Sequence, residues 1–351
     1  MKRNKIDVIV EKVISDAPYS CKYQELCDVF SNTRIDELIC IGVLKKIDNL
    51  ILLDAPVFLE DELIQISYKL KEEAENIFKK FISFIDEINR MALRINNNFS
   101  IKRNLYHIIC GMIFDDKYLD YLAGIGLLRN SKIHLNKLDY VLTIYEKTSK
   151  LERFSKQLLC SYNCFGTQDG ALLSFGDANG SRHDFFRCNL PADTTSKSNK
   201  NSSEYEKHLW YLLNQKSDNC KNYLIRQTRQ FITCGVCDEI CLKLLELYDY
   251  AEHGQICVPV LDKECYSVAY QIESLVEQNL TGAFKCAFEN IHGKFKMTSL
   301  KHGVPVEEIN NEIYHILFGM LNEKLVDEEI VSKPTYKPGE GRYFKAVDLY
   351  S

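Results

Sequence analysis

Residues Asp61–Asn96 contain neither proline nor glycine, and this restricts the segment to regular structure. Apolar side chains recur along it at alternating steps of three and four residues, which places them on one side of a helix. We predict a single long helix that either pairs two subunits or forms a spine buried within its own chain. The additional apolar residues Ile66, Phe78, Ile82 and Ile85 widen the apolar stripe and favour the spine. The seam itself comprises Leu63, Ser67, Leu70, Ala74, Ile77, Phe81, Phe84, Ile88, Met91 and Ile95.

The residues before this stretch carry shorter helical patterns, each with a boundary signal. Three helices are expected, around Ile6–Ile14, Tyr23–Phe30 and Ile35–Ile39. Pro18 ends the first, Ser20 caps the second, the turn at Ser31 precedes the third, and Gly42 follows the third as a C-terminal glycine. Apolar runs on both sides of Asp48-Asn49 predict a β-hairpin over Val43–Leu53.

Three helices followed by a hairpin, with the sequence "RIDELICIGVLKKIDNLILL", resemble the winged helix-turn-helix superfamily. The resemblance covers about 50 residues and rests on pattern alone. It implies a recognition helix that begins near Thr33 and Arg34, with Lys45 and Lys46 on the wing. The predicted fold class is mainly α with small β-hairpins (α+β), in which several winged-helix-like modules are joined by helices.

The remainder of the chain alternates between helical and strand-like patterns. Helices are expected near Leu105–Met112 and Lys117–Ala123, and a strand over Tyr140–Tyr145. A long hairpin should pair Ala171–Phe175 with Arg182–Leu190. Helical spacing dominates residues 205–321, and strand-like segments at Val326–Val331 and Tyr343–Val347 suggest a second wing. The predicted segments are 1–58 (winged helix), 59–98 (long linking or dimerisation helix), 99–190 (mixed α/β-hairpin module), 191–204 (flexible linker), 205–290 (acidic helical) and 291–351 (C-terminal winged-helix-like module).

Composition excludes several classes of protein. With 44 Lys and Arg against 49 Asp and Glu, the chain is unsuited to coating nucleic acid or lipid with its whole surface. No apolar run is long enough to cross a membrane, and the charged start does not resemble a secretory signal. We therefore expect a cytoplasmic protein whose 14 cysteines are reduced.

The charges are unevenly distributed along the chain. Residues 129–229 carry 16 basic and 10 acidic side chains, whereas residues 236–280 carry 2 and 9. A basic middle could follow a phosphate backbone, or it could simply be a solvated face. The candidate phosphate contacts in this region are Arg129, Lys132, Lys137, Arg182 and Arg187.

Motifs of the familiar enzyme classes are missing from the sequence, including phosphate-binding loops and nucleophile elbows. His183 and Asp184, with Asp177 nearby, form the tightest acid–base cluster, but neighbours on a strand point to opposite faces. We expect no catalytic residue and no cofactor.

Four cysteines have the number and spacing of a zinc site: Cys160, Cys164, Cys234 and Cys237. The competing interpretation is core packing, because Cys237 and Cys241 lie on a helical apolar stripe with Leu244 and Tyr248. We favour packing and expect no bound metal. His107 and His315, on apolar helices, are likewise interpreted as core histidines.

The leading functional hypothesis is a non-catalytic DNA-binding protein, either a microbial regulator or an accessory subunit of a DNA-handling or defence system. Its partners would be double-stranded DNA and a protein or a second copy bound through the 61–96 helix, with no membrane. The alternative is a winged-helix protein-interaction scaffold that does not bind DNA directly.

Overall fold

The computed structural model describes residues 6–146, 159–177, 182–188 and 203–349. It is mainly helical with small sheets, as the sequence predicts. The chain forms two compact units, each assembled from three stretches of sequence. Unit 1 comprises residues 1–81, 118–155 and 277–321, and unit 2 comprises residues 82–117, 156–276 and 322–351. This interleaved division differs from the consecutive segments expected from the sequence.

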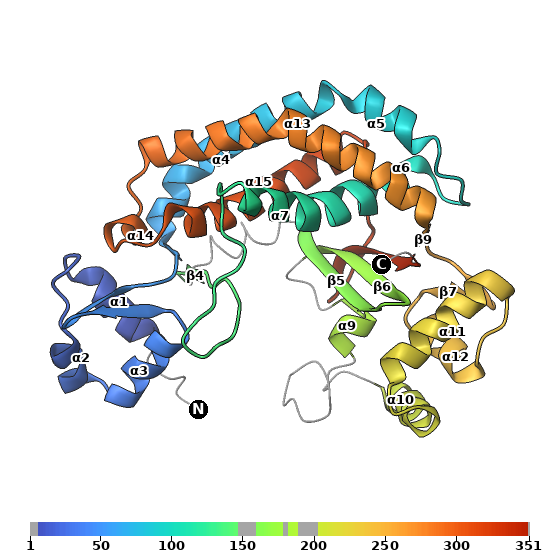
Figure 1. The fold of residues 1–351 in the computed structure, drawn as a ribbon, viewed down its shortest axis with the longest axis horizontal. Coiled ribbons are helices and arrows are strands. Elements are labelled where there is room, and N and C mark those ends of the chain that lie inside the picture. The colour runs from blue at the N-terminus through green and yellow to red at the C-terminus, as the bar shows by residue number, and fades with distance from the viewer. Residues whose placement is uncertain (1–5, 147–158, 178–181, 189–202, 350–351) are drawn as a thin grey trace. The chain divides into compact units, whose positions relative to one another are not determined.

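Unit 1 begins with three helices and a hairpin, all at the predicted positions (Figure 1). The helices are α1 (Ile6–Ser15), α2 (Tyr23–Val29) and α3 (Asn32–Cys40), and the hairpin pairs β1 (Leu44–Ile47) with β2 (Leu50–Leu53). An isolated bridge between Lys22 and Leu50 joins the start of α2 to the hairpin. Gly42 has a positive φ of 74°, which is the left-handed conformation expected of a glycine after a helix.

The single helix predicted over Asp61–Asn96 is wrong, because the structure has α4 (Glu60–Ile82) and α5 (Ile85–Ala92). The sequence gives no sign of the break between them, because it contains no proline or glycine there and the apolar spacing continues across it. The seam residues Leu70, Ile77 and Phe81 are at most 1% exposed within this one chain. These seam side chains pack within their own chain, which is the arrangement that the spine interpretation expects.

The rest of unit 1 packs around α4. It includes α7 (Tyr118–Gly124), residues 277–294 of α13 (Lys263–Lys294), α14 (Thr298–Lys301) and the first part of α15 (Val306–Asp327). Asn290 of α13 donates to the buried Glu73 carboxylate at 2.9 Å, which fixes α13 beside α4 (Figure 1). The strand expected over Tyr140–Tyr145 is shorter: β4 (Ile144–Tyr145) pairs in parallel with β3 (Val57–Phe58).

Unit 2 contains a sheet in the order β10 (Tyr336–Lys337), β11 (Gly341–Asp348), β6 (Gly170–Asp177), β5 (Leu159–Thr167), with β9 (Val260–Leu261) parallel to β11. The predicted hairpin partner was wrong, since β6 pairs with β5 through a turn that ends at Gly170. The φ of Gly170 is 139°, a conformation that non-glycine residues rarely adopt. Residues 185–188, expected to form a strand, form the short helix α9 (Phe185–Cys188).

The C-terminal segment 291–351 is not a winged module. Helix α15 continues to Asp327 and takes up the first two residues of the expected strand Val326–Val331, whose other residues form a turn and a bend. The predicted strand at Tyr343–Val347 does exist within β11, but it pairs with β6, where Phe344 lies opposite Phe175. Strand β11 therefore belongs to the sheet of unit 2, whereas residues 291–321 belong to unit 1.

Helices complete unit 2 around a second core. Those that contribute to it are α10 (Glu204–Lys216), α11 (Cys220–Cys234) and α12 (Glu239–Leu247), with a small hairpin of β7 (Ala251–Glu252) and β8 (Gln255–Ile256). Unit 2 also contains α6 (Ile101–Leu105) and the π-helix η1 (Tyr106–Lys117). Leu213, Leu244 and Tyr248 are fully buried in this core. Of the predicted linker 191–204, residues 191–202 lie outside the described residues, and Ser203 caps α10 by accepting from the Glu206 amide. No described helix is both long and apolar enough to cross a membrane.

Candidate functional site

A loop of residues 131–139, here called the aliphatic loop, packs against the end of α3 in unit 1. Inside the loop, His134 is 8% exposed and stacks on the Tyr140 ring with 4.2 Å between ring centroids. A side chain at Gly42 would collide with this ring, because a Cβ there would lie 1.9 Å from His134 Nδ1. The glycine that ends α3 therefore also allows the loop to approach closely.

Hydrogen bonds to backbone carbonyls hold the loop in this position. The Asn136 amide donates to the Cys40 carbonyl at 3.3 Å, and the Tyr140 hydroxyl donates to the Ile41 carbonyl at 3.0 Å. Within the loop, the His134 amide donates to the Leu138 carbonyl at 3.0 Å. The bonds to Cys40 and Ile41 satisfy carbonyls at the C-terminal end of α3 that have no partner within the helix.

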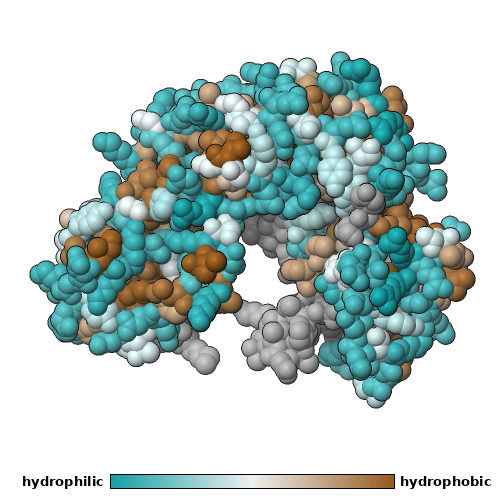
Figure 2. All heavy atoms as spheres, viewed as in Figure 1, coloured by the Kyte–Doolittle hydropathy of each residue, from teal (hydrophilic) through white to brown (hydrophobic). Residues whose placement is uncertain are grey.

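The aliphatic loop directs three large apolar side chains into solvent. Ile133, Leu135 and Leu138 are 76%, 74% and 60% exposed, and Ile41 beside them is 37% exposed. Figure 2 shows hydrophobic side chains at the surface of unit 1 where this loop lies. Single exposed apolar residues are common, but three on one fixed loop are typical of a binding surface. The sequence predictions did not include this site, although Ile133, Leu135 and Leu138 stand between polar residues.

A buried ion-pair network anchors the base of the loop. Glu308 of α15 is 2% exposed, and its carboxylate lies 3.0 Å from Arg129 Nη1 and 3.1 Å from Lys132 Nζ. Lys132 also lies 3.3 Å from the Asp54 carboxylate. Two of the predicted phosphate contacts, Arg129 and Lys132, are therefore occupied within unit 1.

The predicted wing lysines are also engaged by their own chain. Lys45 donates to the Gly303 carbonyl at 2.7 Å, and burial lowers the pKa of Lys45 despite the nearby Asp54. Lys46 lies over the Tyr23 ring at 3.7 Å from the centroid, a cation–π contact.

The remaining predicted nucleic-acid contacts differ in their surroundings. Arg34 pairs with Glu37 at 2.6 Å on the surface of α3, whereas Thr33 and Lys137 are exposed. The prediction that Arg182 contacts phosphate is wrong. Arg182 belongs to unit 2, is 1% exposed, and donates to the Ser174 carbonyl at 3.3 Å. A guanidinium buried in this way cannot follow a phosphate backbone. Arg187 lies in α9 of unit 2, and its side chain is outside the described residues.

His302, near Lys45, is buried without a hydrogen bond to its imidazole ring among the described residues. It is 1% exposed, and neither ring nitrogen has a hydrogen-bond partner among the described residues. Burial, together with the positive charges of Lys45 and Lys301, lowers the pKa of His302 below its usual value.

Because the His302 imidazole is buried, we predict that the free energy of unfolding of the protein depends on pH. Because the folded state disfavours the protonated ring, unfolding should become easier as the pH falls below about 6.5, by at most about 1.4 kcal/mol per pH unit for this one group. His302→Phe should flatten that part of the slope. Urea denaturation from pH 8 to pH 5 measures it, and equal slopes in the two proteins would contradict the prediction.

The acid–base cluster of unit 2 does not converge on a reaction centre. Asp184 is 1% exposed and accepts from Asn163 and from the Ser174 hydroxyl, at 2.9 and 2.6 Å. Asp177 binds Arg342 through both carboxylate oxygens. His183 instead stacks on Tyr248 at 4.5 Å. These side chains therefore serve separate structural contacts.

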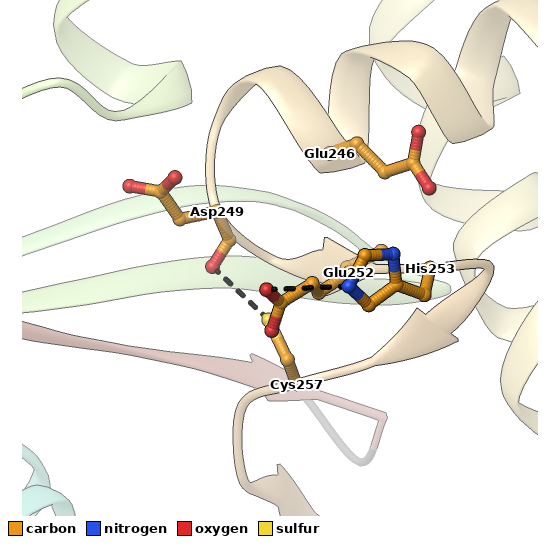
Figure 3. Close-up of a pocket in the computed structure, with 6 residues that line it drawn as sticks. Glu246, Asp249, Glu252, His253 and Cys257 are labelled. Carbon is orange, nitrogen blue, oxygen red and sulfur yellow. Dashed lines mark hydrogen bonds and ion pairs between the residues drawn. The ribbon is translucent and has the colours of Figure 1, made fainter.

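Unit 2 also has a pocket of about 460 Å³ (Figure 3). Three carboxylates line it, from Glu246, Asp249 and Glu252, but each is engaged by the protein. Glu246 accepts from the Gly254 amide, Glu252 lies 3.8 Å from His253, and Asp249 lies 2.9 Å from Lys337 Nζ and 3.3 Å from Lys345 Nζ. Burial opposes the ionisation of Asp249, but Lys345 and Lys337 hold the pKa of this carboxyl below its usual value.

The candidate zinc cysteines do not form a metal site in the described part of the chain. No group of three or more potential ligands there could hold a metal ion. Cys164 and Cys234 are exposed, and burial raises the pKa of Cys237 to about 11. The side chain of Cys160 lies outside the described residues. Cys241 is fully buried in the core of unit 2, as the packing interpretation predicts.

Of the two histidines interpreted as core residues, only His107 is fully buried. It lies in η1 of unit 2 and contacts the Lys345 carbonyl at 3.1 Å. His315, in the part of α15 that belongs to unit 1, is only partly buried and contacts the Asn311 carbonyl at 2.7 Å.

Comparison with known proteins identifies no relative. No protein-family model, curated protein or solved structure matches this chain.

Proposed function

We propose that this chain is a non-catalytic binding protein whose N-terminal winged-helix-like segment, residues 1–58, and aliphatic loop together dock another protein. The observation that carries the proposal is the exposure of Ile133, Leu135 and Leu138 on a loop that is itself fixed to α3. A loop held in one conformation before binding loses little entropy when a partner covers it. Large aliphatic side chains on such a surface supply the apolar contact area of protein interfaces.

The charge arrangement favours protein over DNA as the partner. To contact phosphates, Lys132 would have to leave the buried Glu308 carboxylate, which is costly. The more exposed Arg129 already has its charge paired with the same carboxylate. Helix α3, which would be the recognition helix, presents Asp36 and Glu37 beside its one cation, Arg34. Acidic groups in that position oppose the approach of a phosphate backbone.

A titration with duplex DNA distinguishes the two partner classes. We expect no saturable change in anisotropy when about 10 µM protein is added to a labelled 30-base-pair duplex at low salt, because few of the predicted phosphate contacts are available. Saturable binding that weakens steeply with salt, and that is lost in the variant Arg34→Glu/Lys46→Glu, would favour the DNA hypothesis instead.

Site-specific photo-cross-linking tests the docking surface directly. A photoreactive amino acid in place of Leu135 should yield one discrete protein adduct in the cells from which the chain derives, and Leu138→Asp should abolish it. The matched control replaces Leu93 of unit 2, which is 70% exposed outside the loop. Equal adducts from positions 135 and 93, or none from position 135, would contradict the proposed function.

A further inference from the structure

We infer that the outer edge of β5 in unit 2 pairs with the same edge of a second copy of this chain, so that two sheets join across a two-fold axis. This surface is separate from the aliphatic loop, which belongs to unit 1. Strand β5 lies beside β6 at the end of the sheet order β10-β11-β6-β5, and no other described strand pairs with it (Figure 1). Its backbone can therefore form a second set of strand bonds.

Both faces of β5 are covered by its own unit, which leaves the outer edge as its open side among the described residues. On one face, Phe165 lies in the hydrophobic core with Leu224. On the opposite face, Tyr162 packs against the π-helix, since a Cβ on Gly111 would lie 3.1 Å from the Tyr162 ring. Cys164 shares the face of Tyr162 but is exposed, so the strand is accessible near its middle.

The hairpin register shows which residues direct their backbone groups outwards. Thr167 and Gly170 flank a two-residue turn and form the last pair of the β5–β6 ladder, so they exchange hydrogen bonds with each other. Hydrogen-bonded and non-hydrogen-bonded pairs alternate from there along an antiparallel ladder. The N–H and C=O groups of Gly166, Cys164 and Tyr162 therefore point away from β6, towards the free edge.

The side chains of β5 do not oppose pairing with another strand. Edge strands are ordinarily protected by charged residues, by proline or by a bulge. The sequence of β5, LCSYNCFGT, contains neither a charged residue nor proline. Its one register shift lies between Leu159 and Ser161, at the beginning of the strand. The regular edge from Ser161 to Thr167 therefore lacks these protecting features.

The composition of the edge favours a second copy as the occupant. With the two-fold axis at Cys164, this residue pairs with Cys164 of the second copy, and Tyr162 pairs with Gly166 of the second copy. Each of the three symmetric pairs can exchange two hydrogen bonds, about six in all. Self-pairing places identical or nearby residues opposite each other, so a charged strand would repel itself. The uncharged β5 does not.

Light scattering of the full chain tests the inference. We expect a dimer at about 100 µM protein that dissociates on dilution, because pairing confined to one strand edge makes a small interface. Cys164→Lys should raise the dimer dissociation constant at least about tenfold, since it puts like charges opposite each other. In the matched control, Cys234→Lys changes an exposed cysteine at the end of α11 and should leave the dimer unchanged.

A short bismaleimide distinguishes this pairing from other dimers. Paired Cys164 residues would have Cα atoms about 5.5 Å apart, so the reagent should give a covalent dimer that Cys164→Ser abolishes. Circular dichroism checks that each variant is folded. A dimer unaffected by Cys164→Lys, or a cross-link that persists in Cys164→Ser, would overturn the inference. So would a monomer at about 100 µM, which would leave the edge to a strand of another protein. The proposed function is decided separately, by photo-cross-linking at position 135.

Discussion

Replacing Glu308 by alanine should lower the free energy of unfolding by about 1–3 kcal/mol, because the variant loses two charged hydrogen bonds while the half-exposed Arg129 regains water. The carboxylate is 2% exposed, and Arg129 and Lys132 both lie within 3.1 Å of it. Lys132, whose side chain is 18% exposed, would keep only Asp54 as a counter-ion. Urea denaturation followed by circular dichroism measures the loss.

The neighbouring residue gives the control for this prediction. Glu307→Ala removes the same charge from the same turn of α15 without touching the network and should cost under about 1 kcal/mol. In a double variant, Lys132→Met should recover part of the stability lost in Glu308→Ala, because it removes the cation left without its partner. Equal losses in Glu307→Ala and Glu308→Ala would show that the network is not important for stability.

The network also links stability to the proposed function. Lys132 immediately precedes Ile133, so its ion pair with Glu308 ties the base of the aliphatic loop to α15. We expect Glu308→Ala to weaken partner binding as well as folding, because the loop would lose its preformed position. Arg129 and Lys132, two of the cations that the sequence suggested for DNA contact, both pair with Glu308 at the base of this loop.

The parts of the fold that sequence predicted correctly are those specified by nearby residues. The start and end of α3 depend on residues within one turn, including Gly42, whose left-handed conformation only glycine adopts easily. The β1–β2 hairpin joins adjacent runs across a two-residue turn. Such signals do not require knowledge of the rest of the chain.

The parts that sequence missed depend on pairings between distant residues. The bond from Arg129 to Glu308 spans 179 positions, and a list of basic residues cannot show which of them are neutralised in this way. Strand β6 has an apolar pattern that fits several partners, and its second neighbour, β11, follows the entire helical region. Burial of Arg182 in unit 2 likewise follows from tertiary packing, and local charge counts gave no sign of it.

The contact between β6 and β11 predicts a large effect from a single methyl group. A Cβ on Gly176 would lie 2.0 Å from the Arg342 carbonyl oxygen and 2.5 Å from the Tyr343 Cα, both of them backbone atoms of β11. Gly176→Ala should therefore force the strands apart at the Gly176–Tyr343 pair and destabilise unit 2 by about 3 kcal/mol or more.

The single tryptophan, Trp210, lies in unit 2 and donates to the Tyr248 hydroxyl at 3.3 Å, so its fluorescence during urea denaturation reports on this unit. The matched control is Gly282→Ala in α13, an exposed helical position where a Cβ would meet no atom within 4 Å. Because Gly282 belongs to unit 1, that variant should leave the tryptophan transition unchanged. It should gain about 0.5–1 kcal/mol in denaturation followed by circular dichroism, because alanine favours helix and restricts the unfolded chain. An unchanged tryptophan transition in Gly176→Ala would mean that β6 and β11 are not packed this closely, and the sheet of unit 2 would have to be paired differently.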